Sequence, residues 1–205
     1  MGLISKGTGG GTDFEPVPTG THIARCISVV DLGFQETRNG MKEKVYLGFE
    51  VPAIRVSWKK DNVDHEGPAL IGATYNNSVH PKSVLGQHLV NWRGRAFTEL
   101  ELEGFDLFTV LNVWCMVSVV HNVKDQRTYA NISGIMGLPK GTMVPPAETP
   151  VVAYTPQDAA YAMNLSKLPE WLQRKCADGG GQHGAPPDHH NTPPPIDDFD
   201  DDIPF

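Results

Sequence analysis

The sequence has few cysteines and no long apolar run, and these absences exclude several classes of protein. Among its 205 residues are three cysteines, Cys26, Cys115 and Cys176, which lie far apart and form no CxxC pair. This spacing suits neither a zinc site nor a disulfide framework, and it is typical of a reducing cytoplasm. No apolar stretch approaches the roughly 20 residues that a membrane-spanning helix needs. Residues 1–12 contain no apolar segment of a secretory signal. We therefore expect a cytoplasmic protein that is not bound to a membrane.

The sequence also lacks a recognisable catalytic or cofactor-binding motif. His80, His88 and His121 have no Asp, Cys or Ser partner at an interpretable spacing. The glycine-rich residues 7–11 precede no helix and therefore form no phosphate-binding loop. Three more histidines lie in a Gly/Pro-rich stretch near the end, where only adventitious metal binding is expected. We expect no enzyme, no cofactor and no metal site.

Charge is unevenly distributed along the chain. There are 24 acidic and 17 basic residues, which give a formal net charge of −7. Seven of the acids and none of the bases fall in residues 177–205, so residues 1–176 are formally neutral. Residues 25–95 hold ten bases and seven acids. The pattern predicts a neutral body with room for a basic surface, followed by a separate acidic tail.

Alternating and β-branched residues predict five strands, at 21–31, 44–51, 69–78, 113–123 and 128–135. The first two are separated by a loop at 33–40 with Asn39-Gly40 as its turn, and the second extends toward Trp58 if Pro52 marks a bulge. Residues 59–67 read as a polar turn. A helix is predicted at 83–92, ended by Gly94, and a capping box at Thr98–Glu101 opens a shorter one. The order β-β-β-α-β-β matches a mainly β fold, the five-stranded OB-fold barrel.

Composition divides the chain into five segments. Residues 1–19 are a flexible N-terminus, and residues 20–138 carry the OB-fold barrel. Residues 139–176 are Pro-rich, with short helices at 155–164 and 166–176 that we expect to pack on the barrel. Residues 177–196 are a disordered linker, because they contain no set of residues able to form a core. Residues 197–205 form an acidic tip.

The acidic tip has the chemistry of a peptide ligand. Its apolar side chains suit a hydrophobic slot, its proline restricts the chain before docking, and its carboxylates suit a basic rim. A solubilising tail would explain the acids but not the ending Ile-Pro-Phe. The residues concerned are Asp198, Phe199, Asp200, Asp201, Asp202, Ile203, Pro204 and Phe205.

Residues 198–205 resemble the C-terminal tip of bacterial single-stranded DNA-binding proteins, which also follows a Gly/Pro-rich linker. The resemblance implies that the tip docks on replication, recombination and repair enzymes while an OB-fold binds the single strand. The body differs from that of ordinary bacterial members in its strand lengths, at residues 81–110 and at 138–176. It is more similar to phage- or prophage-encoded relatives, for which the location would be the cytoplasm of a bacterial host. The family's usual homotetramer makes a homo-oligomer an open alternative here.

An OB-fold that binds single strands without reading sequence needs aromatic side chains for stacking and cations for phosphates. Trp58 is the strongest candidate, because it precedes Lys59 and Lys60 in a polar segment. The alternatives are core packing for each aromatic and an ion pair for Arg25. We assign Phe49, Trp114 and Phe105 to the core, and Trp92 and Trp171 to helix packing. The predicted DNA-binding residues are Arg25, Lys42, Lys44, Tyr46, Trp58, Lys59, Lys60, Tyr75, Arg127 and Tyr129.

Two functions compete on these grounds. The first is a single-stranded DNA-binding protein that coats DNA in replication, recombination or repair and recruits enzymes through its tip. The second is an adaptor or decoy, whose tip captures enzymes that bind host single-stranded DNA-binding protein while its barrel binds no DNA. The neutral body favours the second somewhat. An enzymatic function, such as a nuclease, lacks acidic metal ligands at usable spacing.

Overall fold

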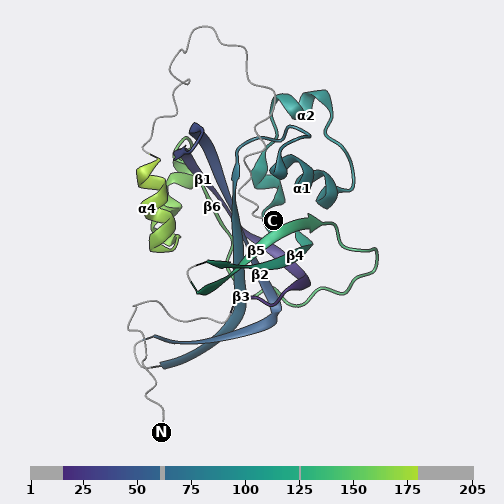
Figure 1. Cartoon of the computed structure of the whole chain (residues 1–205), viewed down its shortest axis with the longest axis vertical. Coiled ribbons are helices and arrows are strands. Elements are labelled where there is room, and N and C mark those ends of the chain that lie inside the picture. Colours follow the sequence, from purple (N-terminus) through teal and green to yellow (C-terminus); the bar gives the residue numbers. More distant parts are fainter. Residues whose placement is uncertain (1–15, 61–62, 125, 180–205) are drawn as a thin grey trace.

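The computed structural model describes residues 16–60, 63–124 and 126–179 and is mainly β (Figure 1). Five antiparallel strands form one curled sheet in the order β3-β2-β1-β4-β5. Their bounds are Gly20–Thr37 for β1, Gly40–Lys60 for β2, Val63–Asn76 for β3, Trp114–Lys124 for β4 and Arg127–Met136 for β5. A short strand, β6 (Val152–Tyr154), pairs with β1 in parallel. The predicted order β-β-β-α-β-β is confirmed, and β6 is an addition to it.

The first hairpin is longer than predicted. The segment expected to be a loop at residues 33–40 continues β1 to Thr37, and the chain then turns at Arg38 and Asn39. Gly40 follows with φ of 91°, a conformation that glycine adopts without strain. Register shifts after Cys26 and Asp31 bend β1 and interrupt its alternation, which is why the sequence pattern ended the strand too early.

The second hairpin ends in a two-stranded ribbon. A register shift between Val51 and Arg55 lets β2 pass through Pro52, as the sequence suggested. Beyond this bulge, Arg55–Lys60 pair with Val63–Pro68, whereas the pairing of β2 with β1 stops at Glu50. The expected polar turn at 59–67 is therefore mostly strand.

Three short helices connect β3 to β4. α1 (Val84–Arg93) begins at Ser83, whose side chain accepts a hydrogen bond from the Gly86 amide, and ends at Gly94 in the left-handed conformation. α2 (Glu99–Glu103) has the predicted capping box of Thr98 and Glu101. A 3-10 helix, η1 (Leu107–Val110), leads into β4. α1 contacts both β3 and β5, the two outer strands of the sheet.

The main core lies between the curled sheet and α1. Phe49 is fully buried, as predicted, and its ring packs 5.8 Å from that of Trp92 on α1. Leu89 of α1 and Val117 of β4 complete the centre. Trp114 and Phe105, which we assigned to the core, are only partly buried.

A second, smaller core lies on the side of the sheet away from α1 (Figure 1). There Val30 and Leu32 of β1 pack against Leu168 and Leu172. The covering elements are β6, the 3-10 helix η2 (Met163–Lys167) and α4 (Glu170–Asp178), and a short helix, α3 (Ala159–Ala162), leads into η2. The predicted helix at 155–164 starts late, because Asp158 rather than Thr155 caps it.

Several expectations concern residues outside the described part of the chain. They are the N-terminal segment up to residue 15, the linker from residue 180 and the whole acidic tip. Among the helices of the described residues, none has both the length and the apolar character to cross a membrane.

Candidate nucleic-acid interface

Two hollows adjoin along β3, an outer strand of the sheet. One has a volume of about 610 Å³ and the other of about 730 Å³, and Gly72 of β3 lines both. Helix α4 reaches both as well: Trp171 lines the first hollow, and Lys175, one turn later, lines the second. We call them the aromatic hollow and the polar hollow.

The aromatic hollow gathers side chains that are distant in sequence. Tyr46 and Trp58 come from β2, Tyr129 from β5 and Trp171 from α4. No charged residue is among those that line it. Tyr129 is 47% exposed and Trp171 is 44% exposed, so both rings present surface to solvent. The structure thus brings together three of the four aromatic residues that we predicted to stack on bases.

Tyr46 lies flat across the sheet because its neighbours are glycines. A Cβ atom at Gly72 would stand 2.1 Å from the Tyr46 hydroxyl oxygen, and one at Gly48 would stand 3.0 Å from the ring. The indole of Trp171 meets the Tyr46 ring edge-to-face, with centroids 5.3 Å apart, and Lys175 Nζ lies 5.9 Å from the indole. Burial raises the pKa of Tyr46 to about 12, so its hydroxyl keeps its proton at neutral pH.

Trp58 stands on the two-stranded ribbon. Its ring stacks on the imidazole of His65, with centroids 5.7 Å apart and planes 15° apart. It also lies against Gly67, where an added Cβ would approach the ring to 3.0 Å. The neighbouring Lys59 pairs at 3.5 Å with Asp64, but both side chains are well exposed and the pair adds little stability.

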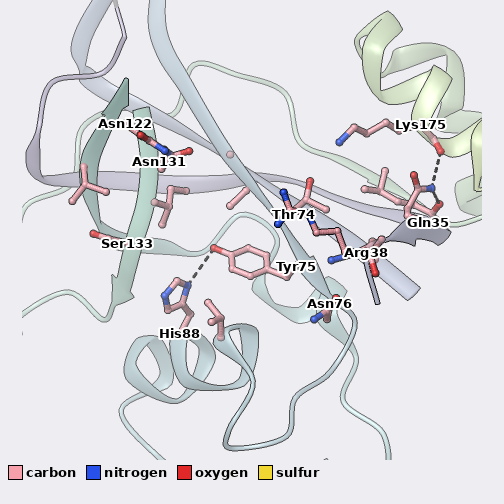
Figure 2. Close-up of a pocket in the computed structure, with 18 of the residues that line it drawn as sticks. Gln35, Arg38, Thr74, Tyr75, Asn76, His88, Asn122, Asn131, Ser133 and Lys175 are labelled. Carbon is pink, nitrogen blue, oxygen red and sulfur yellow. Dashed lines mark hydrogen bonds between the residues drawn. The ribbon is translucent and has the colours of Figure 1, made fainter. Parts of the chain in front are cut away.

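The polar hollow has different walls. Its lining includes three cations (Arg38, Lys44 and Lys175) and one acid (Glu36). Amide side chains are also prominent, namely those of Gln35, Asn76, Asn122 and Asn131. Figure 2 shows Asn122 and Asn131 side by side on one wall, and Arg38 and Asn76 on the other. The hollow is therefore both cationic and rich in hydrogen-bonding groups.

The floor of the polar hollow is a buried pair, Tyr75 and His88. The Tyr75 hydroxyl and His88 Nδ1 are 3.2 Å apart (Figure 2). Burial lowers the pKa of His88, against a backbone hydrogen bond with Ser133 that raises it, so the imidazole is neutral at pH 7. Tyr75 is only 5% exposed and belongs to the main core. Its prediction as a base-stacking residue is wrong, because the alternation of β3 places its ring on the core face, opposite the buried Val45.

The prediction that Arg25 binds DNA is also wrong. The side chain is 4% exposed and its Nε donates to Glu50 Oε1 at 2.6 Å, so it is not available to DNA. Asn112 and the carbonyl of Thr149 accept its other hydrogen bonds. Burial would raise the pKa of Glu50, but the hydrogen bonds from Arg25 and Thr149 and the charge of Arg25 outweigh it, and the pKa lies below its usual value.

The remaining predicted cations lie at separate places. Lys42 and Lys44 begin β2, opposite Gln35 and Gly33, and Lys44 lines the polar hollow. Arg127 is exposed at the start of β5, two residues before Tyr129. Lys60 ends β2, and its side chain lies outside the described part of the structure. Among the members of this group whose side chains are described, only Lys44 lines either hollow.

Sequence reasoning missed the contribution of α4 and of the amides. Trp171 was assigned to helix packing, although Arg174 and Lys175 follow it within one turn. That is the combination of an aromatic residue with nearby bases that selected Trp58. Asn122 and Asn131 carried no such signal, because a lone asparagine on a strand is common and their meeting depends on the pairing of β4 with β5.

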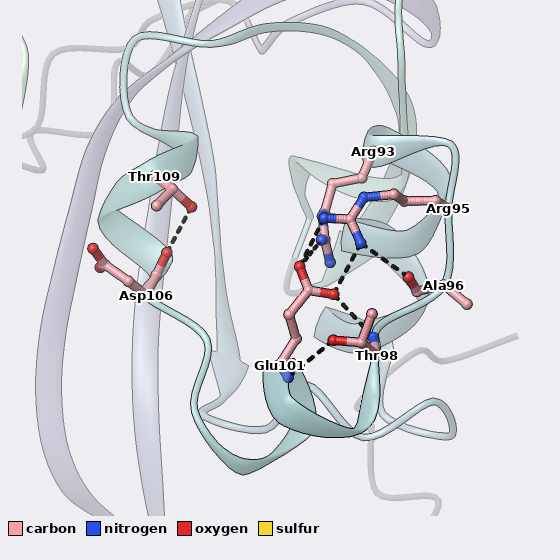
Figure 3. A network of polar contacts seen from close by, with 7 residues as sticks. All are labelled: Arg93, Arg95, Ala96, Thr98, Glu101, Asp106 and Thr109. Atoms are coloured by element: carbon pink, nitrogen blue, oxygen red, sulfur yellow. Dashed lines mark hydrogen bonds and ion pairs between the residues drawn. The ribbon is translucent and has the colours of Figure 1, made fainter.

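A third polar cluster, around Glu101, is structural. Arg93 and Arg95 both donate to this carboxylate, which also accepts from the Thr98 amide (Figure 3). Hydrogen bonds from Arg95, then Thr98 and Arg93, lower the pKa of Glu101 to about 2. Arg93 lies over the rings of Phe97 and Phe105, at 4.4 and 4.8 Å from their centroids. Glu101 therefore fixes the segment after α1, besides closing the predicted capping box.

Within the described residues, no group of three His, Cys, Asp or Glu side chains is placed to hold a metal ion. No protein-family model matches the chain, and no curated protein matches it.

Proposed function

We propose that the chain is a single-stranded DNA-binding protein of phage or prophage type, which coats unpaired DNA during replication, recombination or repair. The observation that carries this proposal is the aromatic hollow beside the cationic polar hollow. Aromatic faces stack on bases of any identity, and neighbouring cations follow the phosphates. Tyr46, Trp58, Tyr129 and Trp171 supply four such faces in one lining.

We further propose that the sheet is an OB-fold. β1 pairs with both β2 and β4, β3 and β5 contact each other, and α1 stands between β3 and β4 in sequence. OB-folds bind oligonucleotides on the face of their second and third strands, between the β1–β2 and β4–β5 loops. The two hollows occupy the corresponding region, since β2, β3, the first hairpin and the β4–β5 pair all line them.

The resemblance of residues 198–205 to the tip of the family supports a role in recruitment. We propose that these residues dock on replication, recombination or repair enzymes while the sheet holds the strand. An extended apolar and acidic peptide suits a hydrophobic slot with a basic rim.

A titration with fluorescently labelled oligo(dT), followed by anisotropy, tests DNA binding. We expect micromolar or tighter affinity that falls with added salt. Trp58→Ala should weaken binding about ten-fold, because one stacked base contributes roughly 1–3 kcal/mol. Leu100→Ala, which removes an exposed apolar side chain of α2 away from both hollows, is the control.

Two results would contradict the proposal. Absence of binding at moderate salt would favour the adaptor or decoy function. The zero formal net charge of residues 1–176 is consistent with that alternative. Equal affinity of Trp58→Ala and Leu100→Ala would remove the aromatic hollow from the binding surface.

A further inference from the structure

The polar hollow holds amide groups that form no hydrogen bond with other described residues. The side chains of Asn122 and Asn131 are two such groups, and Asn76 Oδ1 is buried without a donor. Gln35 differs: its Nε2 donates to the carbonyls of Leu32 at 2.7 Å and Lys175 at 3.0 Å, which ties β1 to α4. The uncommitted amides that a ligand can reach are thus the pair on the β4–β5 wall (Figure 2).

Binding a strand without regard to its sequence does not require amide side chains. Stacking faces and cations suffice to bind a strand of any sequence, and the aromatic hollow contains no amide side chain. An asparagine side chain offers two donors and one acceptor at fixed spacing, and such groups pair with the edges of bases. The two hollows therefore differ in kind: one offers stacking surface and the other offers hydrogen-bond readout.

The dimensions and charge of the polar hollow suit one nucleotide. Its volume of about 730 Å³ lies in the range of small-molecule sites, ~300–1,000 Å³. Its floor is the neutral pair of Tyr75 and His88. Arg38 and Lys175 lie on the lining nearer to α4 and the first hairpin, in position for a phosphate (Figure 2).

Taking the proposed DNA binding as its basis, we propose that the polar hollow reads the identity of one unpaired base through Asn122 and Asn131. The protein then binds strands of any sequence through the aromatic hollow but prefers one base at a single position. The amide pair on the β4–β5 wall meets the base edge, and Arg38 and Lys175 hold its phosphate.

The test compares homopolymers rather than one sequence. Affinities for labelled dT, dC and dA oligonucleotides of equal length are measured with the full chain and with Asn122→Ala/Asn131→Ala. We expect the double variant to lose about ten-fold more affinity for one homopolymer than for the others, since a paired base edge discriminates by about that factor. Self-stacking of the oligonucleotides is the same for both proteins and cancels in the comparison.

Trp58→Ala is the matched control, because loss of a stacking face should weaken the affinity for all three homopolymers by a similar factor.

Asn131→Asp gives a second readout, because it changes the hydrogen-bonding groups of the side chain with almost no change in its volume. A carboxylate only accepts hydrogen bonds, so dC and dA, whose bases carry amino groups, should gain relative to dT by about five-fold.

Equal losses for the three homopolymers in the double variant, within two-fold, would overturn base reading and leave the hollow a contact for sugar and phosphate. Unchanged affinity in both asparagine variants would exclude the hollow from the binding path. Failure of the unaltered protein to bind any homopolymer would refute the proposed function itself, a result distinct from both.

Discussion

Arg25 and Glu50 form an ion pair whose burial depends on residues far away in the sequence. Glu50 lies on the same face of β2 as Tyr46, opposite to the face that carries Phe49. The Thr149 amide, 99 residues later, covers it and donates to Glu50 Oε2 at 2.8 Å. No local pattern predicts that cover. Phe49, by contrast, was predictable, because strand alternation alone places it inside.

The buried ion pair makes a prediction for stability and pH. Glu50→Gln should lower the free energy of unfolding by about 3–5 kcal/mol at pH 7, because it leaves the Arg25 charge buried without its partner. The pKa of Glu50 is lower in the folded protein than its ordinary 4.5. The contribution of its charge is thus complete above pH 4.5 and is lost as the pH falls through the folded pKa. Urea unfolding between pH 7 and pH 3 measures both effects.

The control for this experiment is Glu103→Gln, at an exposed position on α2. It should change stability by less than about 0.5 kcal/mol. A Glu50→Gln protein that loses as much stability as the unaltered chain between pH 5 and pH 3 would show that other carboxylates dominate the acid response.

At the scale of elements, capping and turn residues predicted where helices and hairpins begin and end. Ser83 begins α1, Gly94 ends it, and the capping box opens α2. The first hairpin turns at Arg38 and Asn39, one residue before the predicted Asn39-Gly40. β6 and the start of α3 were missed. β6 has three residues and exists through its pairing with β1, so a short Val-Ala-Tyr sequence in a Pro-rich region carries no strand signal of its own.

Helix α4 depends on its packing for stability. With nine residues, it is too short to be stable alone, and Leu172, fully buried, attaches it to β1. Leu172→Ala should detach α4 while the main core stays folded. Hydrogen exchange should then show lost protection at residues 170–178 and unchanged protection in β2 and β4. Binding of oligo(dT) should weaken, because Trp171 leaves Tyr46.

Met163→Ala, an exposed position on η2, is the control for this substitution. Loss of protection across the whole sheet in Leu172→Ala would mean that the second core is required for the first.

Across the whole molecule, the negative net charge comes from residues 177–205, whereas residues 1–176 are formally neutral. The sequence predicted a mainly β protein with the correct order of strands and helix along the chain. It predicted three of the aromatic residues that line the aromatic hollow, but not that Trp171 of α4 lines it too. The position of α4 depends on how residues 139–179 fold back onto β1, and this tertiary packing leaves no local signal in the sequence.

The tail should affect DNA binding through its charge. Removal of residues 197–205 should raise the affinity for oligo(dT) at low salt, because the acidic tip competes for the cations of the polar hollow, and the difference should vanish at high salt. Phe205→Ala keeps every side-chain carboxylate and should leave DNA affinity unchanged while abolishing the capture of partner enzymes. Unaltered low-salt affinity after the removal would count against the competition.

Gly72 lies where the two hollows meet, and the Tyr46 hydroxyl occupies the space that a methyl group would need there. A phenol ring can rest directly on the backbone only because the residue beneath it has no side chain. Even an alanine at position 72 would push that ring outward and reshape the wall of the aromatic hollow.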